Sequence, residues 1–144
     1  PLELWVDGQP KGQPRARAFA MKGKGVRMYD PATAEGWKGQ IATAIREFMP
    51  PFPLTGAIRI DLTFYFPRPK GHYRTGKRST ELRDDAPIWH LGKPDRDNCD
   101  KAVLDALKVM GFLSDDCIVC DGRIQKRYSE GREGMLIRVS EAGI

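Results

Sequence analysis

Residues 93–107 read KPDRDNCDKAVLDAL, and residues 113–116 read LSDD. This region is acidic within a basic chain. Seven aspartates and three bases lie between residues 95 and 121, whereas the whole protein has a formal net charge of +5. Carboxylates placed close together repel one another, and a divalent cation offsets that repulsion. The surrounding positive charge favours a polyanionic partner. Together these features indicate metal-dependent chemistry on a phosphodiester backbone.

The acidic residues stand where an extended segment is expected to become a helix. Pro94 disfavours the helical conformation at Lys93, so Asp95 and Asp97 should project to the same side of an extended approach. Asp97 or Asn98 would then cap the helix. Two stripes recur along this helix at spacings of three and four. The apolar stripe holds Val103, Ala106, Leu107 and Met110, and the polar stripe holds Asp97, Lys101, Asp105 and Lys108.

A second pair of acids is expected in the loop just after this helix. Gly111 is typical of the residue just beyond a helix end, and Asp115-Asp116 follow in the loop before the next strand. Lys101 lies one turn beyond Asp97, within reach of whatever the aspartates bind. Asp100 falls off the polar stripe and is expected to take no part in the site.

Five parts of this region form a combined pattern: KPDRDN at 93–98, KA at 101–102, DAL at 105–107, GFL at 111–113 and DD at 115–116. The pattern closely resembles that of RusA-type Holliday junction resolvases, with the strong match covering about residues 93–127. The resemblance implies a homodimer that depends on Mg²⁺, with Mn²⁺ as the alternative ion, and cuts four-way DNA junctions. It also implies site residues. Asp95, Asp97 and Asp116 would be the metal-binding catalytic carboxylates, Asp115 a further candidate metal ligand, and Lys101 the catalytic or phosphate-contacting lysine.

A purely structural interpretation of these residues is the alternative to a metal site. Asp97 could be only a helix cap, and Lys101 and Asp105 only an exposed i,i+4 pair worth about 0.3–0.5 kcal/mol. That interpretation leaves Asp95 and Asp115-Asp116 without a role. A calcium-binding EF-hand is excluded, because the segment starting at Asp95 lacks glycine at its sixth position and glutamate at its twelfth. The metal site is therefore favoured.

Two basic segments flank the acidic region and are predicted to contact DNA phosphates. Residues 8–29 contain six bases and no acid, and residues 67–93 contain seven bases against three acids. For residues 70–85, order and disorder in the free protein are equally open. The candidate DNA contacts are Arg15, Arg17, Lys22, Lys24, Arg68, Lys70, Lys93 and Arg96.

The remaining pattern predicts a small α+β domain over residues 1–144. Alternating apolar residues predict strands at 2–7 and 57–66, a third over 118–127 and a final hairpin strand at 135–139. A first helix is expected to start with Asp30 as its cap and Pro31 in its first turn. The expected architecture is a mixed or antiparallel sheet with two helices in the order β-α-β-α-β-β. The buried face of the first helix should carry Trp37, Ile41, Ala44, Ile45 and Phe48.

Composition narrows the class of protein further. No run of eighteen apolar residues occurs, so no membrane span is predicted. The odd number of cysteines, three, favours a reducing compartment, and a bacterial or phage-infected cytoplasm is expected. The expected function is resolution of Holliday junctions by paired symmetric nicks in recombination and repair. Two alternatives stay open: a metal-dependent nuclease for flaps or forks, and a non-catalytic structure-selective DNA-binding protein.

Overall fold

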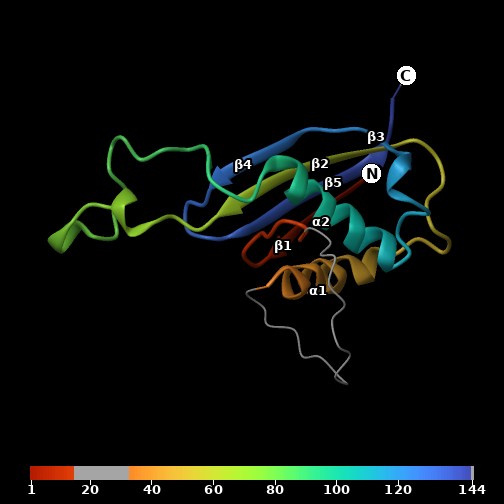
Figure 1. Ribbon diagram of the computed structural model, residues 1–144, viewed down its shortest axis with the longest axis horizontal. Coiled ribbons are helices and arrows are strands. Elements are labelled where there is room, and N and C mark those ends of the chain that lie inside the picture. The colour runs from red at the N-terminus through yellow and green to blue at the C-terminus, as the bar shows by residue number, and fades with distance from the viewer. Residues whose placement is uncertain (15–32, 144) are drawn as a thin grey trace.

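The computed structural model describes residues 1–14 and 33–143. It combines a mixed β-sheet with two α-helices (Figure 1), which confirms the expected α+β class. The elements are β1 (Leu2–Asp7), α1 (Ala34–Ile45), β2 (Ile58–Phe66), α2 (Arg96–Val109), β3 (Val119–Asp121), β4 (Ile124–Tyr128) and β5 (Gly134–Glu141). Among the described residues, no helix is long and apolar enough to cross a membrane.

Strand β2 lies at the centre of the sheet. β5 pairs antiparallel with both β1 and β2, while β3 and β4 run parallel to β2 on its other edge. The predicted final hairpin is therefore wrong, because β2 lies between β4 and β5. Since β4 runs parallel to β2, both strands end on the same side of the sheet. The turn after β4 passes the end of β2. β5 therefore pairs with the other edge of β2 and lies between β2 and β1.

The strand expected over residues 118–127 is divided into two. A 3-10 turn occupies Asp116–Ile118, and the break between β3 and β4 falls at Gly122 and Arg123. Gly122 has φ +145°, and a side chain there would overlap the carbonyl oxygen of Ile60. The Asp61 carboxylate accepts a hydrogen bond from the Arg123 backbone N–H at 2.8 Å. The break is thus a bulge that only glycine fits, held by a side chain of β2.

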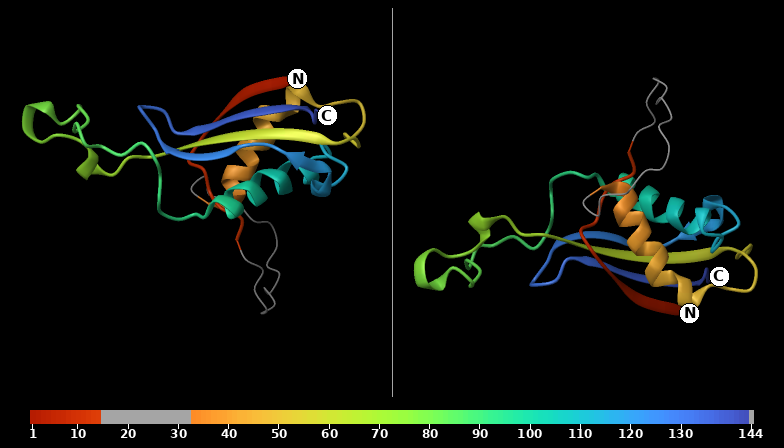
Figure 2. Two further views of the ribbon diagram at one scale, coloured as in Figure 1. Left: turned by 90° about the horizontal axis from the view of Figure 1, so that it is seen from above. Right: turned by 90° about the horizontal axis from the view of Figure 1, so that it is seen from below.

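Both helices cover the same face of the sheet (Figure 2). The alternate residues of β2 that start at Ile58 are all buried against them, as the sequence predicted. Lys38 of α1 and Asp105 of α2 join the helices through an ion pair of 2.8 Å. Phe48 was expected on the buried face of α1 but is 48% exposed. The chain tightens into a 3-10 turn after Ile45, and this changes the direction of the Phe48 side chain.

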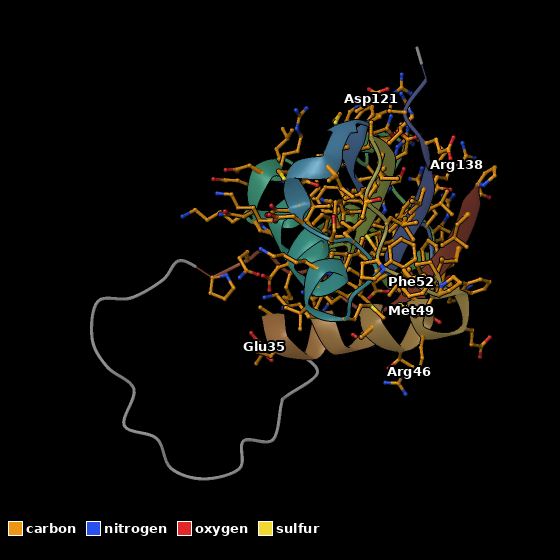
Figure 3. The ribbon with its side chains drawn as sticks, turned by 90° about the vertical axis from the view of Figure 1, so that its right-hand side faces the viewer. Glu35, Arg46, Met49, Phe52, Asp121 and Arg138 are labelled. Carbon is orange, nitrogen blue, oxygen red and sulfur yellow. The ribbon has the colours of Figure 1, made fainter. Side chains whose placement is uncertain are left out.

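The opposite face of the sheet carries paired charges. Arg59 binds Asp61 at 2.9 Å and Asp121 at 2.8 Å, and Arg138 pairs with Glu3 of the neighbouring strand. Figure 3 shows Asp121 and Arg138 on the side of the molecule away from α1. Arg59 and Arg138 are therefore each neutralised by a neighbouring acid on this face.

The two helices start at different residues from those predicted. The cap of α1 is Thr33, whose hydroxyl accepts from the Gly36 N–H at 3.2 Å. The expected start at Asp30 is therefore wrong, and Asp30 itself lies outside the described residues. In α2 the cap is Asp95, and Asp97 already lies in the first turn. Pro94 restricts only the residue before it, so it does not delay the helix. Asp95 is still extended, and Arg96 is the first helical residue.

The end of α2 agrees with the sequence. Gly111 has φ +83°, and its N–H donates to the Lys108 carbonyl at 3.0 Å. The Phe112 N–H donates to the Leu107 carbonyl at 2.9 Å. This pair of bonds is the Schellman pattern, in which glycine adopts the left-handed conformation at low cost. The turn directs the chain toward Asp115-Asp116.

Residues 67–93 form an arm that projects beyond the end of the sheet (Figure 1). The arm has internal structure, with 3-10 turns at Lys70–His72 and Gly76–Arg78. Its two legs are bridged between Tyr73 and Leu82, and the Arg74 N–H donates to the Glu81 carbonyl at 2.8 Å. The arm returns the chain to β4, where Trp89 bridges Arg127, and then leads into α2.

Candidate functional site

The start of α2 presents carboxylates that have no partner within the described part of the chain. Asp95 occupies the cap position but makes no side-chain capping bond, and Asp97 lies in the first turn. Both are exposed, and neither carboxylate forms an ion pair or hydrogen bond with another described residue. The partial positive charge of a helix start favours negative groups there. These two side chains are therefore free to bind a ligand.

The second acidic pair enters from the loop after α2. The Asp115 carboxylate accepts from the Asp116 backbone N–H at 2.7 Å and pairs with Lys108 at 3.2 Å. The hydrogen bond from Lys108 is the main cause that lowers the pKa of Asp115 below its usual value. Asp115 is thus engaged within the protein, whereas Asp116 is exposed at the start of its 3-10 turn.

Asp100 lies close to these acids. It is half-buried, and burial raises its pKa above the usual value. The charge of Asp116 raises it further, while Arg96 acts in the opposite direction. Asp100 therefore lies near Asp116 although it falls off the polar stripe, and its expected lack of a role in the site stays a prediction. The sequence did indicate that Asp100 lies near the other acids, because a spacing of three from Asp97 places both residues on one side of a helix.

The donor atoms fit a hard cation, although they do not form a closed cage. Among residues 1–14 and 33–143, no group of three or more His, Cys, Asp or Glu side chains is arranged to hold a metal ion. Burial raises the pKa of the Cys99 thiol to about 12, and the charges of Asp95, Asp97 and Asp100 add to that shift. The start of α2 is thus electronegative. Mg²⁺ usually takes one or two protein carboxylates and keeps several waters, so an open site of this kind suits it.

Lys101, like Arg96, is a base on α2 without an ion-pair partner in the described chain. The alternative pair of Lys101 with Asp105 is not formed, because Asp105 binds Lys38 of α1 at 2.8 Å. Lys108 is likewise engaged with Asp115. Lys101 is exposed and has no ion-pair partner in the described chain. It can therefore contact a bound phosphate without first breaking an internal bond.

The other candidate DNA contacts fall into three groups. Lys70, Lys93 and Arg96 are exposed. Arg68 instead holds the base of the arm, with its guanidinium donating to the carbonyls of Ser129 at 2.8 Å and Pro87 at 2.7 Å. The predicted contacts in the first basic segment lie outside the described residues: Arg15, Arg17, Lys22 and Lys24.

Comparison with known proteins assigns the chain to a family. The family described as Endodeoxyribonuclease RusA matches residues 7–140. A relative described as uncharacterized protein YqaN, from Bacillus subtilis (strain 168), is 33% identical over 129 residues. That alignment covers 90% of this chain and 89% of the relative. The match covers β2, β3, β4, nearly all of β5, both helices and the acids of the candidate site, so the protein belongs to the RusA endodeoxyribonuclease family.

Proposed function

We propose that this protein is a Mg²⁺-dependent endodeoxyribonuclease that resolves four-way (Holliday) junctions by paired symmetric nicks during DNA recombination and repair. The observation that carries the proposal is the pair of exposed carboxylates of Asp95 and Asp97 at the start of α2, which have no partner among the described residues. They occur in a chain of the RusA endodeoxyribonuclease family that has a net positive charge. This combination suits an enzyme that holds a cation against a DNA phosphate.

The residues have separate roles in the proposed reaction. Asp95, Asp97 and Asp116 would hold the ion. Asp115 stays a weaker candidate because its carboxylate already forms an ion pair with Lys108. When bound, Mg²⁺, or Mn²⁺ in its place, would lower the pKa of a bound water and offset negative charge on the phosphate. Lys101 would steady the phosphate as negative charge develops on its oxygens.

DNA binding should not require the metal, because contacts from Lys and Arg to phosphates are independent of it. We expect a four-way junction to bind in EDTA with an affinity that falls steeply as salt is added. Replacing Arg15, Arg17, Lys22 and Lys24 together with alanine should flatten the salt slope by about one unit per lost phosphate contact. Fluorescence anisotropy over a salt series measures this slope.

The matched control is Arg46→Ala, which removes an exposed base at the opposite end of α1 from the acidic site. Its salt slope should equal that of the wild-type protein. If the quadruple variant also keeps the wild-type slope, the first basic segment does not contact DNA.

The proposed reaction also needs two active sites. A four-way junction has two equivalent strands, and productive resolution requires two nicks related by symmetry. One 16.2 kDa chain carries one acidic site, so an isologous two-fold dimer supplies the second. Analytical ultracentrifugation should give a particle of twice the chain mass. A monomer both free and on the junction would contradict junction resolution.

A cleavage assay distinguishes the proposal from its alternatives. A plasmid cruciform, a flap and a fork are incubated with the protein in Mg²⁺ and in EDTA. Paired nicks in the cruciform that require Mg²⁺ support junction resolution. Preferential cutting of the flap or fork indicates the alternative nuclease, and binding without cutting indicates a DNA-binding protein.

A further inference from the structure

A cavity of about 630 Å³ opens beside Asp95. Its walls come from four parts of the chain: residues 9–13 after β1, Ala34 at the start of α1, the end of β2, and residues 90–98 around the start of α2. This volume is within the range of about 300–1,000 Å³ that is typical of small-ligand sites. The cavity therefore has room for a ligand directly next to a proposed catalytic carboxylate.

The wall formed by residues 9–13 is fixed in place. The Gln13 backbone N–H donates to the Asn98 carbonyl at 2.9 Å, which ties this segment to the first turn of α2. A Cβ atom on Gly12 would lie 2.7 Å from the Cβ of Pro94, so the two backbones approach closely. Pro10 is buried beneath them. The main chain of Gln13 is thus fixed at the cavity, and this keeps its side chain there.

A second wall is flat and aromatic. The His90 ring stacks on Phe66 with 3.9 Å between the ring centroids and 13° between the planes. Tyr128 meets His90 edge-on at 5.1 Å. Burial, and then the charge of Lys126, lower the pKa of His90 below its usual value, so the ring is neutral near pH 7. Phe66 is only 2% exposed, so the partly buried His90 ring is the aromatic group that this wall offers to a ligand.

Two polar atoms of the cavity residues lack hydrogen-bond partners. Gln13 Oε1 and His90 Nδ1 are buried and unpaired among the described residues. A buried polar group without a partner is costly, so native proteins pair such groups with protein, water or ligand. A ligand with a flat ring and polar edges would supply partners for both atoms once their side chains turn toward the cavity.

We propose that this cavity receives one unstacked nucleobase, from a nucleotide adjacent to the cleaved phosphate, and that Gln13 recognises the edge of that base. The inference rests on the proposed function. Unstacked bases are recognised by stacking on flat side chains and by hydrogen bonds to their edges, and an amide side chain suits the second task. Asp95 lines the same cavity, so a base held there leaves its phosphate near the acids. Lys93 also lines the cavity and supplies a positive charge for that phosphate.

The consequence is a preference for particular bases at the cut. Cleavage positions are first mapped in Mg²⁺. Junctions that differ only in one base flanking the mapped position are then compared by competition binding in EDTA, where no cutting occurs. We expect the wild-type protein to discriminate between bases at one flanking position by at least about fivefold, the lower end of what one base contributes. Gln13→Met, which keeps the length of the side chain, should reduce this discrimination to less than twofold.

Gln125→Ala is the control, because it removes an amide from the open face of the sheet and should keep the wild-type preference. Wild-type binding to all junctions with equal affinity overturns the inference without any variant. So does a Gln13→Met protein that melts like wild type and keeps the preference. Failure to bind any junction would instead contradict the proposed function itself.

Discussion

Asparagine in place of Asp95, Asp97 or Asp116 is expected to abolish cleavage of a four-way junction in Mg²⁺ almost completely. Asparagine keeps the size and the capping ability of aspartate but removes the charge that holds a cation. Asp95 and Asp97 have no ion pair to lose within the described chain, so the fold should survive. Single-turnover cleavage of a cruciform should slow by at least about 10³-fold, as for the loss of other catalytic groups.

Binding by the same variants separates a catalytic role from a structural one. In EDTA, their affinity for the junction should equal or exceed that of the wild-type protein, because a negative charge facing phosphates has been removed. Cleavage at wild-type rates by all three variants would place the chemistry elsewhere.

The choice of control follows from the structure. Asp100→Asn, expected from the sequence to cut normally, is unsuitable, because Asp100 is half-buried and senses the charge of Asp116. Asp85→Asn is better matched. Asp85 is an exposed acid of the arm without a partner among the described residues, and its variant should cut like wild type.

Local periodicity predicted the elements well. The alternation along β2 and the apolar stripe of α2 follow from which side chains must leave water, and that requirement is visible in the sequence. Gly111 marked the end of α2 because a left-handed residue there is nearly always glycine. In each case the deciding interaction is between residues a few positions apart.

The pairing of strands could not be predicted in this way. The sequence favoured a hairpin of β4 and β5 because adjacent strands commonly pair, yet β2 lies between them. Both edges of β2 are buried by partners that follow it by more than fifty residues in the chain. Such pairing depends on competition between whole strands for one central position, which a local pattern does not record.

The acidic site shows the same limit. Its acids could be identified from residue type and spacing, but the bases that pair with them in the fold could not. Asp105 is held by Lys38 of the other helix, and Asp115 by Lys108. The cavity beside Asp95 was not predicted, because its walls meet only after residues 9–13 pack on the start of α2.

Lys101→Ala is expected to slow the cleavage step by about 10²–10³-fold, the usual cost of removing one group that stabilises charge in the transition state. Lys101 is exposed one turn beyond Asp97 and is free of ion pairs in the described part of the chain. Its loss should therefore leave folding unchanged. The single-turnover rate at saturating protein measures the cleavage step without a contribution from binding.

Metal titration distinguishes this role from a general electrostatic one. If Lys101 acts on the phosphate, the Mg²⁺ concentration at half-maximal rate should stay within about twofold of the wild-type value while the maximal rate falls. Lys101→Arg keeps the charge but changes its geometry, and should restore part of the rate. Lys77→Ala removes an exposed base of the arm and should leave the saturated rate unchanged. A Lys101→Ala protein that cuts normally once saturated would reduce Lys101 to one of several phosphate contacts and leave the aspartates alone as catalytic groups.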